Sequence, residues 1–300
     1  MNAQKLKGNL MMLLTALIWG TAFVAQSNAM DSVDPFSFMA ARYLLGALVL
    51  LPVIAVFSKK DKNESKKTLW IGGISCGVIL FVASALQQWG LVFTTTAKAG
   101  FITTLYVVFV PLAGLFFKRK PAPIVWIGVA LSTVGFYLLC MTERFTLELG
   151  DFLVLLCAIA FTGHIMVIDH FSPKVDGVKL SCIQFLICGL LSLIAALIVG
   201  PCKPNELLAA WLPIAYTGVL SSGVAYTLQI LAQKFTDPVM VSLIGSLEAV
   251  FATLSGYVFW KLGYIGNGDV TPRQLIGCAL VFIAVILVQL PTPKSKKQGA

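Results

Sequence analysis

The chain has 300 residues, of which 58% are hydrophobic and 12% charged. A soluble domain usually has about a quarter of its residues charged, so this composition excludes a soluble globular protein. The net charge of +9 does not indicate nucleic-acid binding, because the basic residues lie in short segments between apolar stretches. There they can face anionic lipid headgroups.

Ten apolar stretches follow one another, and each is close to the roughly 20 residues with which a helix crosses the hydrocarbon core. They predict spans at about 8–29, 35–57, 68–91, 97–117, 122–141, 150–169, 179–200, 211–233, 237–260 and 273–290. The first stretch follows Lys5 and Lys7, as the apolar part of a signal peptide would. It is too long for that role and has a counterpart in span 6, so we interpret it as an uncleaved first span.

The orientation follows from the Lys and Arg residues of the connecting segments. With the N-terminus inside, sixteen of the 22 basic residues fall in inner segments and five in outer ones, while Arg42 lies within a span. Basic residues favour the cytoplasmic side. We therefore expect a multi-pass protein of the cytoplasmic membrane with both termini in the cytoplasm, as a monomer or homodimer.

The sequence resembles itself when it is shifted by 142 residues. Eleven of the 33 positions from 85 to 117 are then identical, and Gln87 falls on Gln229. Past Gly256 the shift becomes 149 residues, and the extra residues fall within the Gly-rich segment 263–269. Five spans per copy is an odd number, so the second copy must cross the membrane in the opposite sense.

The sequence thus predicts an all-α integral membrane fold of ten transmembrane helices in two inverted five-helix repeats. The first repeat covers residues 1–142, the second covers 143–292, and 293–300 form a basic cytoplasmic tail. Transporters built in this way often bind substrate near the bilayer midplane, between the repeats.

In the first repeat, four residues are candidates for that site. Trp19 either stacks on substrate or packs against neighbouring helices. Arg42 either extends outward toward Asp31 or Asp34 or draws an anionic group into the cavity. Gln87 lines a cavity or bonds another helix, and Tyr106 lines the cavity or packs as an aromatic residue.

In the second repeat, His164 is either a proton relay with Asp169 and His170 or a histidine near a water-facing helix end. Tyr226 and Gln229 are predicted to share one polar face with Ser222. We expect that face and Gln87, which corresponds to Gln229 in span 3, to line a cavity or to form hydrogen bonds between helices without contacting substrate.

Glu248 is the candidate that depends least on the repeat. It lies midway along span 9, about 16 Å of helix from each interface. A carboxyl group at that depth faces a cavity, has a partner or is protonated. It either couples transport to protons, contacts substrate, or holds an opposing helix.

Several short motifs resemble those of a known family. They are Trp19-Gly20, Arg42-Tyr43, Ala85-Leu86 leading to the turn at 94–97, Leu247 to Val250, and Gln274 to Gly277. In this order and spacing, over roughly residues 8–290, they resemble the EamA-type transporters of the drug/metabolite transporter superfamily. The resemblance implies a secondary active transporter that exports small organic metabolites such as amino acids.

We expect alternating access around a cavity lined by spans 1, 3, 4, 6, 8 and 9, with energy from protons or from exchange. The alternative is a membrane-embedded enzyme acting on lipid-linked substrates, which would need polar catalytic residues near one interface. The two histidines have no cysteine at ligand spacing, so no metal site is predicted. No cofactor motif is present, and no ATP-binding loop.

Overall fold

The computed structural model describes residues 3–30, 32–57, 65–94, 96–140, 148–200, 203–263 and 269–290. Its helices are α1 (Ala3–Met30), α2 (Pro35–Phe57), α3 (Lys66–Phe93), α4 (Thr96–Thr104), α5 (Tyr106–Phe116), α6 (Pro123–Cys140), α7 (Leu149–Phe171), α8 (Gly177–Val199), α9 (Pro204–Ala209), α10 (Trp211–Tyr216), the π-helix η1 (Thr217–Tyr226), α11 (Thr227–Ala232), α12 (Pro238–Gly245), α13 (Leu247–Lys261) and α14 (Pro272–Gln289). The predicted tail 293–300, most of the segment 263–269 and Thr95 of the predicted turn lie outside the described residues.

The described residues contain ten helical stretches that are long and apolar enough to cross a membrane. Only helices and closed barrels satisfy their own backbone hydrogen bonds in lipid, and these stretches are helical apart from single-residue turns in two of them. The prediction of an all-α membrane fold with ten spans is confirmed. The stretches match the predicted spans to within a few residues at most ends.

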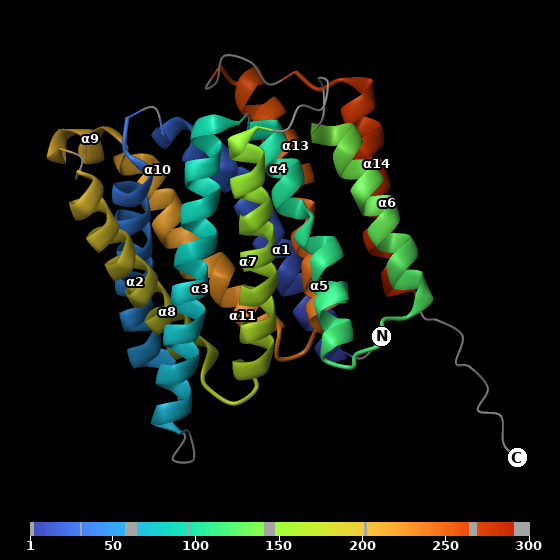
Figure 1. Ribbon diagram of the computed structural model, residues 1–300, viewed down its shortest axis with the longest axis horizontal. Helices are drawn as coiled ribbons and strands as arrows, with labels where there is room; N and C mark the ends of the chain where they lie inside the picture. Colours follow the sequence, from blue (N-terminus) through green and yellow to red (C-terminus); the bar gives the residue numbers. More distant parts are fainter. Residues whose placement is uncertain are drawn as a thin grey trace, which may run out of the picture.

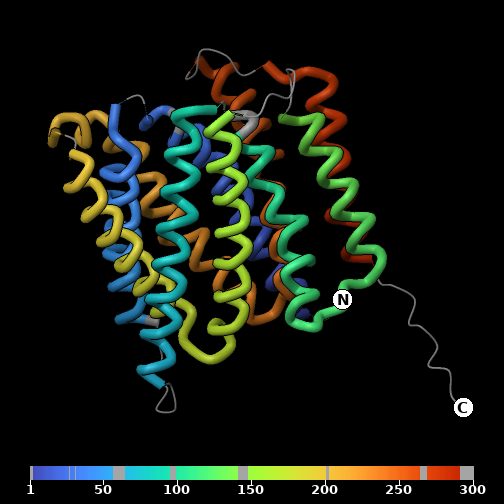
Figure 2. The backbone as a smooth tube through the Cα atoms, in the orientation of Figure 1, coloured from blue at the N-terminus to red at the C-terminus, as the bar shows by residue number. Residues whose placement is uncertain are grey.

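The long helices run side by side in one bundle, as Figures 1 and 2 show. Extensive contacts join α3 with α7 and α8, α2 with α8, and α6 with α14. Helix α1 packs against α13, η1, α11 and α12 and exposes its other face. It is therefore an integral part of the packed structure, as expected for a first span.

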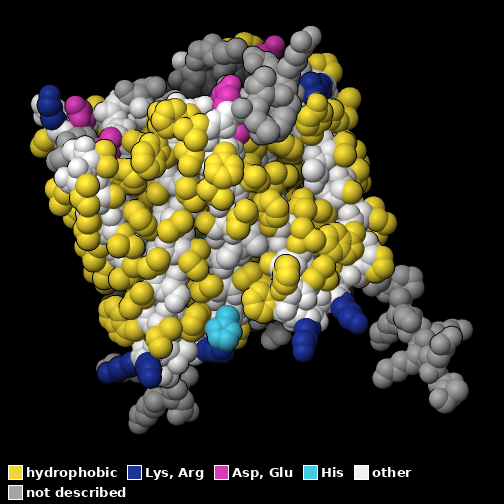
Figure 3. All heavy atoms as spheres, in the orientation of Figure 1, with side chains coloured by type: hydrophobic (Ala, Val, Ile, Leu, Met, Phe, Trp, Pro, Cys, Tyr) yellow, Lys and Arg dark blue, Asp and Glu magenta, His cyan; other side chains and the backbone are white. Residues whose placement is uncertain are grey.

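Hydrophobic side chains cover the middle of the face shown in Figure 3, and most of the charged side chains on that face lie toward its two ends. Large hydrophobic side chains such as Leu51, Val56 and Ile198 are strongly exposed. An exposed apolar belt of this kind suits a surface in contact with lipid. Basic side chains are most numerous at the lower end in this view, where the α7–α8 turn lies.

Three of the ten spans are not continuous α-helices. Span 4 is interrupted at Leu105, between α4 and α5, and span 9 at Ser246, between α12 and α13. Span 8 contains the ten-residue π-helix η1. Irregular backbone at membrane depth occurs where it is buried in protein or lines a cavity, so these three spans indicate where a site lies.

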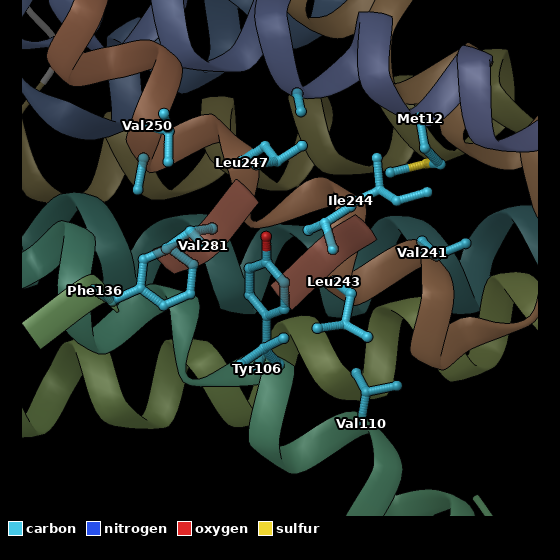
Figure 4. Packing of buried hydrophobic residues seen from close by; sticks show 14 of the residues in the cluster. Met12, Tyr106, Val110, Phe136, Val241, Leu243, Ile244, Leu247, Val250 and Val281 are labelled. Carbon is cyan, nitrogen blue, oxygen red and sulfur yellow. The ribbon is translucent and has the colours of Figure 1, made fainter. Parts of the chain in front are cut away.

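A cluster of buried apolar residues supports the two interrupted spans from one side. It includes Val107 and Val110 from α5, Phe136 from α6, and Leu243 and Leu247 from α12 and α13. In Figure 4 the Tyr106 ring extends from α5 with its hydroxyl group pointing toward the segment that carries Ile244 and Leu247. The cluster therefore holds spans 4 and 9 against each other next to the cavity described below.

Candidate functional site

One small cavity lies where the three irregular spans meet α1, α2, α3 and α7. It encloses about 60 Å³, which is room for a few water molecules. Its lining residues are Met12, Trp19, Phe23, Gln26, Arg42, Gln87, Thr103, Tyr106, Phe161, His164, Ile165, Ser221, Tyr226, Gln229, Val241, Gly245 and Glu248. All eight residues that the sequence analysis singled out are among them. That they bind substrate or couple transport stays a prediction.

The lining comes from spans 1, 3, 4, 6, 8 and 9, as expected, and in addition from span 2 through Arg42. Two of its side chains, Arg42 and Glu248, belong to residue types that are charged in water. Both are almost fully buried, with 5% and 7% of their surface exposed. Ionisable groups at this depth are costly and usually belong to the functional site of a membrane protein.

Glu248 and Tyr106 meet across the cavity. The Tyr106 hydroxyl group donates a hydrogen bond to Glu248 Oε1 over 3.1 Å. Each residue lies within two positions of the interruption in its own span, at Leu105 and Ser246. Tyr106 therefore lines the cavity and bonds the acid, while its ring also packs in the apolar cluster.

Arg42 points into the molecule. Its guanidinium group donates to Gln26 Oε1 and, over 2.8 Å, to the Tyr43 hydroxyl. The Tyr43 hydroxyl in turn shares a 2.7 Å hydrogen bond with Ser84 Oγ. Arg42 therefore does not extend outward to Asp34, because the described groups that bond the guanidinium belong to α1 and α2, and Asp31 lies outside the described residues.

Glutamines in the cavity lining and next to it form hydrogen bonds between helices. Gln87 Nε2 donates to Thr103 Oγ1 over 3.3 Å, and Gln88 Nε2 donates to Gln26 Oε1 over 3.1 Å. Gln229 Oε1 is buried and has no protein partner. Gln87 thus both lines the cavity and bonds another helix, whereas Gln229 lines the cavity with an unsatisfied oxygen that leaves one acceptor for a ligand or water.

Span 8 presents a different face from the one predicted. Ser222 packs against Gly46 and is absent from the lining, whereas Ser221 contributes to it. The predicted face assumed α-helical spacing, but in a π-helix the hydrogen bonds join residues i and i+5 and the turn is wider. Tyr226 and Gln229 keep their predicted positions in the cavity.

Two side chains of α1 bond to the wider turn of η1. Trp19 Nε1 donates to the Ser221 carbonyl over 3.3 Å, and Thr15 Oγ1 donates to the Ala225 carbonyl over 3.0 Å. The Trp19 and Tyr226 rings lie 4.7 Å apart. Trp19 therefore anchors α1 to span 8 while one side of its ring faces the cavity.

His164 is buried beside the cavity, so the alternative of a histidine near a water-facing helix end is wrong. Its Nε2 lies 3.1 Å from Gln184 Oε1, and its Nδ1 has no partner. Asp169 forms an ion pair with Arg119 instead. The relay role of His164 stays a prediction.

Sequence reasoning missed three polar residues of the cavity: Gln26, Thr103 and Ser221. A signal for Gln26 was present, because Trp19, Phe23 and Gln26 recur at helical spacing on one face of span 1. Thr103 and Ser221 gave no such signal. Small hydroxyl side chains are common in membrane helices, where they also bond their own backbone.

Comparison with known proteins gives one family. The model of the EamA-like transporter family matches residues 6–141 and residues 148–290. A protein of Archaeoglobus fulgidus described as an uncharacterized transporter is 33% identical over 294 residues, which cover 96% of this chain and 87% of that protein. The threonine/homoserine exporter RhtA of Escherichia coli (strain K12) is 23% identical over 292 residues, covering 96% of this chain and 92% of RhtA.

A solved crystal structure has the same fold. It superposes with a TM-score of 0.77 at 20% sequence identity, and the match covers 94% of this chain and 96% of the other. At that identity the likeness shows the fold alone.

Proposed function

This chain belongs to the EamA-like transporter family, and on that premise we propose that it is a secondary active exporter of small organic metabolites such as amino acids. Its named relatives are transporters, so it is a multi-pass membrane transporter and not an enzyme. The reading as an enzyme on lipid-linked substrates is therefore not supported. The amino-acid substrate class and the export direction are supported by the printed name of RhtA.

The proposal assigns residues 1–142 and 143–292 to two inverted repeats. The observation that carries it is the Tyr106–Glu248 hydrogen bond, because these residues lie 142 positions apart, which is the shift at which the sequence resembles itself. The interruptions at Leu105 and Ser246 correspond to within one residue under the same shift. Interrupted helices at corresponding positions of two halves are a good pointer to a transporter's site.

A second set of contacts supports the repeats. An added Cβ at Gly128 in α6 would meet Val288 in α14, and one at Gly277 in α14 would meet Leu139 in α6. Under the shift of 149 residues, Gly128 corresponds to Gly277 and Leu139 corresponds to Val288. The α6–α14 contact is therefore self-complementary, as an interface across a pseudo-twofold axis must be.

Alternating access follows from this arrangement. The small cavity lies where both repeats contribute a discontinuous span, so rocking one repeat against the other would expose the same lining to each side in turn. A cavity of about 60 Å³ is too small for most metabolites. Binding such a molecule would therefore require the cavity to widen.

Glu248 is the residue that we propose to carry the coupling proton. Its carboxyl group lies in the cavity, and its hydrogen bond comes from the neutral hydroxyl group of Tyr106. No cation of the described residues is paired with it. A carboxyl group placed in this way can take up a proton from one side and release it to the other as the cavity opens in turn.

The test is transport of radiolabelled amino acids in proteoliposomes with an imposed proton gradient. We expect the Glu248→Gln variant to remain folded and to lose the dependence of transport on the gradient, because a carboxamide does not exchange a proton. Glu206→Gln, which removes a carboxylate at the N-terminus of the short helix α9, is the control and should keep that dependence. A Glu248→Gln protein that responds to the gradient like the wild type would eliminate the coupling role.

A further inference from the structure

Arg42 is a buried cation without an anionic partner among the residues that the structure describes. Its two terminal nitrogens donate to neutral oxygens, those of Gln26 and Tyr43, and its Nε is buried without any partner. One ion pair of the described residues joins Arg119 and Asp169, and Arg42 takes no part in it. An uncompensated charge at this depth is expensive, which calls for an explanation of why a cation is there.

Neutral groups from three helices hold the guanidinium group in place. Gln26 of α1 accepts from both Arg42 and Gln88, and Tyr43 of α2 is fixed by Ser84 of α3. The guanidinium carbon also lies 4.5 Å from the centre of the Tyr43 ring. These contacts fix the direction of the group, and none of these described partners carries a negative charge, so the geometry is that of a preformed site.

We propose that Arg42 binds the carboxylate of the transported molecule, so that the substrate supplies the missing negative charge. The planar fork of an arginine fits a carboxylate with two parallel hydrogen bonds. Glu248 is the carboxyl group of the cavity lining, and it contributes a hydrogen-bond acceptor from the second repeat. An α-amino acid presents a carboxylate to the first residue and an ammonium group to the second.

This inference rests on the proposed transport function and deepens it by naming the group that is recognised. It also separates Arg42 from a merely structural residue. A structural hydrogen-bond donor would work as well without its charge, whereas a carboxylate receptor needs that charge. The readout must therefore compare ligands that differ only in the carboxylate.

The experiment measures thermal unfolding of the purified full chain with the twenty L-amino acids and with their carboxamides, at equal ionic strength. A ligand that binds only the folded protein raises the unfolding temperature. We expect at least one amino acid to stabilise the wild type and its carboxamide to bind at least about tenfold more weakly. This preference should disappear in Arg42→Gln and persist, reduced, in Arg42→Lys.

Arg273→Gln, which removes an arginine at the start of α14, is the matched control and should keep the preference. Arg42→Lys retains the charge and gives a result even where Arg42→Gln does not fold. Three outcomes overturn the proposal: acids and amides that stabilise equally, a preference that survives in Arg42→Gln, or no stabilisation of the wild type by any amino acid.

Proteoliposome transport separates this inference from the proposed function. Transport of amines or uncharged metabolites without preference for a carboxylate would support the transport function and contradict the role of Arg42 in binding a carboxylate. Binding of amino acids that depends on Arg42, without transport of any of them, would support the carboxylate site and contradict the export function.

Discussion

Gly20 lies where α1 comes closest to the backbone of α13, next to the cavity. A Cβ atom at this position would lie 2.5 Å from Phe251 Cβ and 2.7 Å from the Glu248 carbonyl oxygen. Neither atom can move aside alone, because both are fixed to the helix backbone. The absence of a side chain at Gly20 therefore sets the distance between α1 and the helix that carries Glu248.

Replacing Gly20 with Ala should lower stability, by about 1–3 kcal/mol, because an extra methyl group in a filled contact forces the helices apart. Gly163→Ala is the matched control, since a Cβ at Gly163 meets nothing within 4 Å. There the better helix propensity of Ala should leave stability unchanged or slightly higher. Thermal unfolding in detergent measures both, and equal effects of the two substitutions would contradict the close approach.

At the scale of the element, the π-helix η1 is the feature that neither length nor hydropathy indicates. Its wide turn brings Ser221 instead of Ser222 to the cavity. Side chains of α1 bond two of its carbonyl groups, at Ser221 and Ala225. Contacts between helices thus stabilise a backbone conformation that is rare in itself.

Thr15→Val should therefore destabilise the protein by about 1 kcal/mol, because it removes the donor to the Ala225 carbonyl while keeping the shape of the side chain. Thr133→Val is its control. The Thr133 hydroxyl bonds the Val129 carbonyl of its own helix, so its loss should matter little. Unfolding temperatures of the two variants provide the comparison, and a Thr15→Val protein as stable as the control would show that α1 does not support η1.

The whole molecule has to be placed in the membrane in one of two orientations. We propose that it lies in the cytoplasmic membrane with both termini inside, because Lys and Arg are concentrated at one set of helix ends. The lower end of the face in Figure 3 is the more basic one. Lys67, at the start of α3, belongs to that set, whereas Lys261, at the end of α13, belongs to the opposite one.

Cysteine labelling in intact cells tests this orientation. In a background without the seven native cysteines, a membrane-impermeant maleimide should label Lys261→Cys and not Lys67→Cys. Permeabilised cells should show labelling of both, which confirms that both positions are accessible in the structure. Labelling of Lys67→Cys alone in intact cells would place the termini outside.

The number of spans, their approximate ends and the candidate site residues could all be predicted from the sequence. Each of these follows from a local cost: about 20 apolar residues are needed to cross the lipid, and a charge such as Arg42 or Glu248 is expensive within a span wherever it points. The shift of 142 residues also indicated that Tyr106 and Glu248 occupy equivalent positions.

Only the tertiary structure decided where those side chains point and what they meet. That Arg42 turns inward to Gln26, that Tyr106 donates to Glu248, and that Ser221 replaces Ser222 in the lining all depend on neighbouring helices. The physical reason is that a helix in lipid satisfies its own backbone and gains little from one rotation over another by itself. Its rotation and its interruptions are settled by packing and hydrogen bonds with other helices.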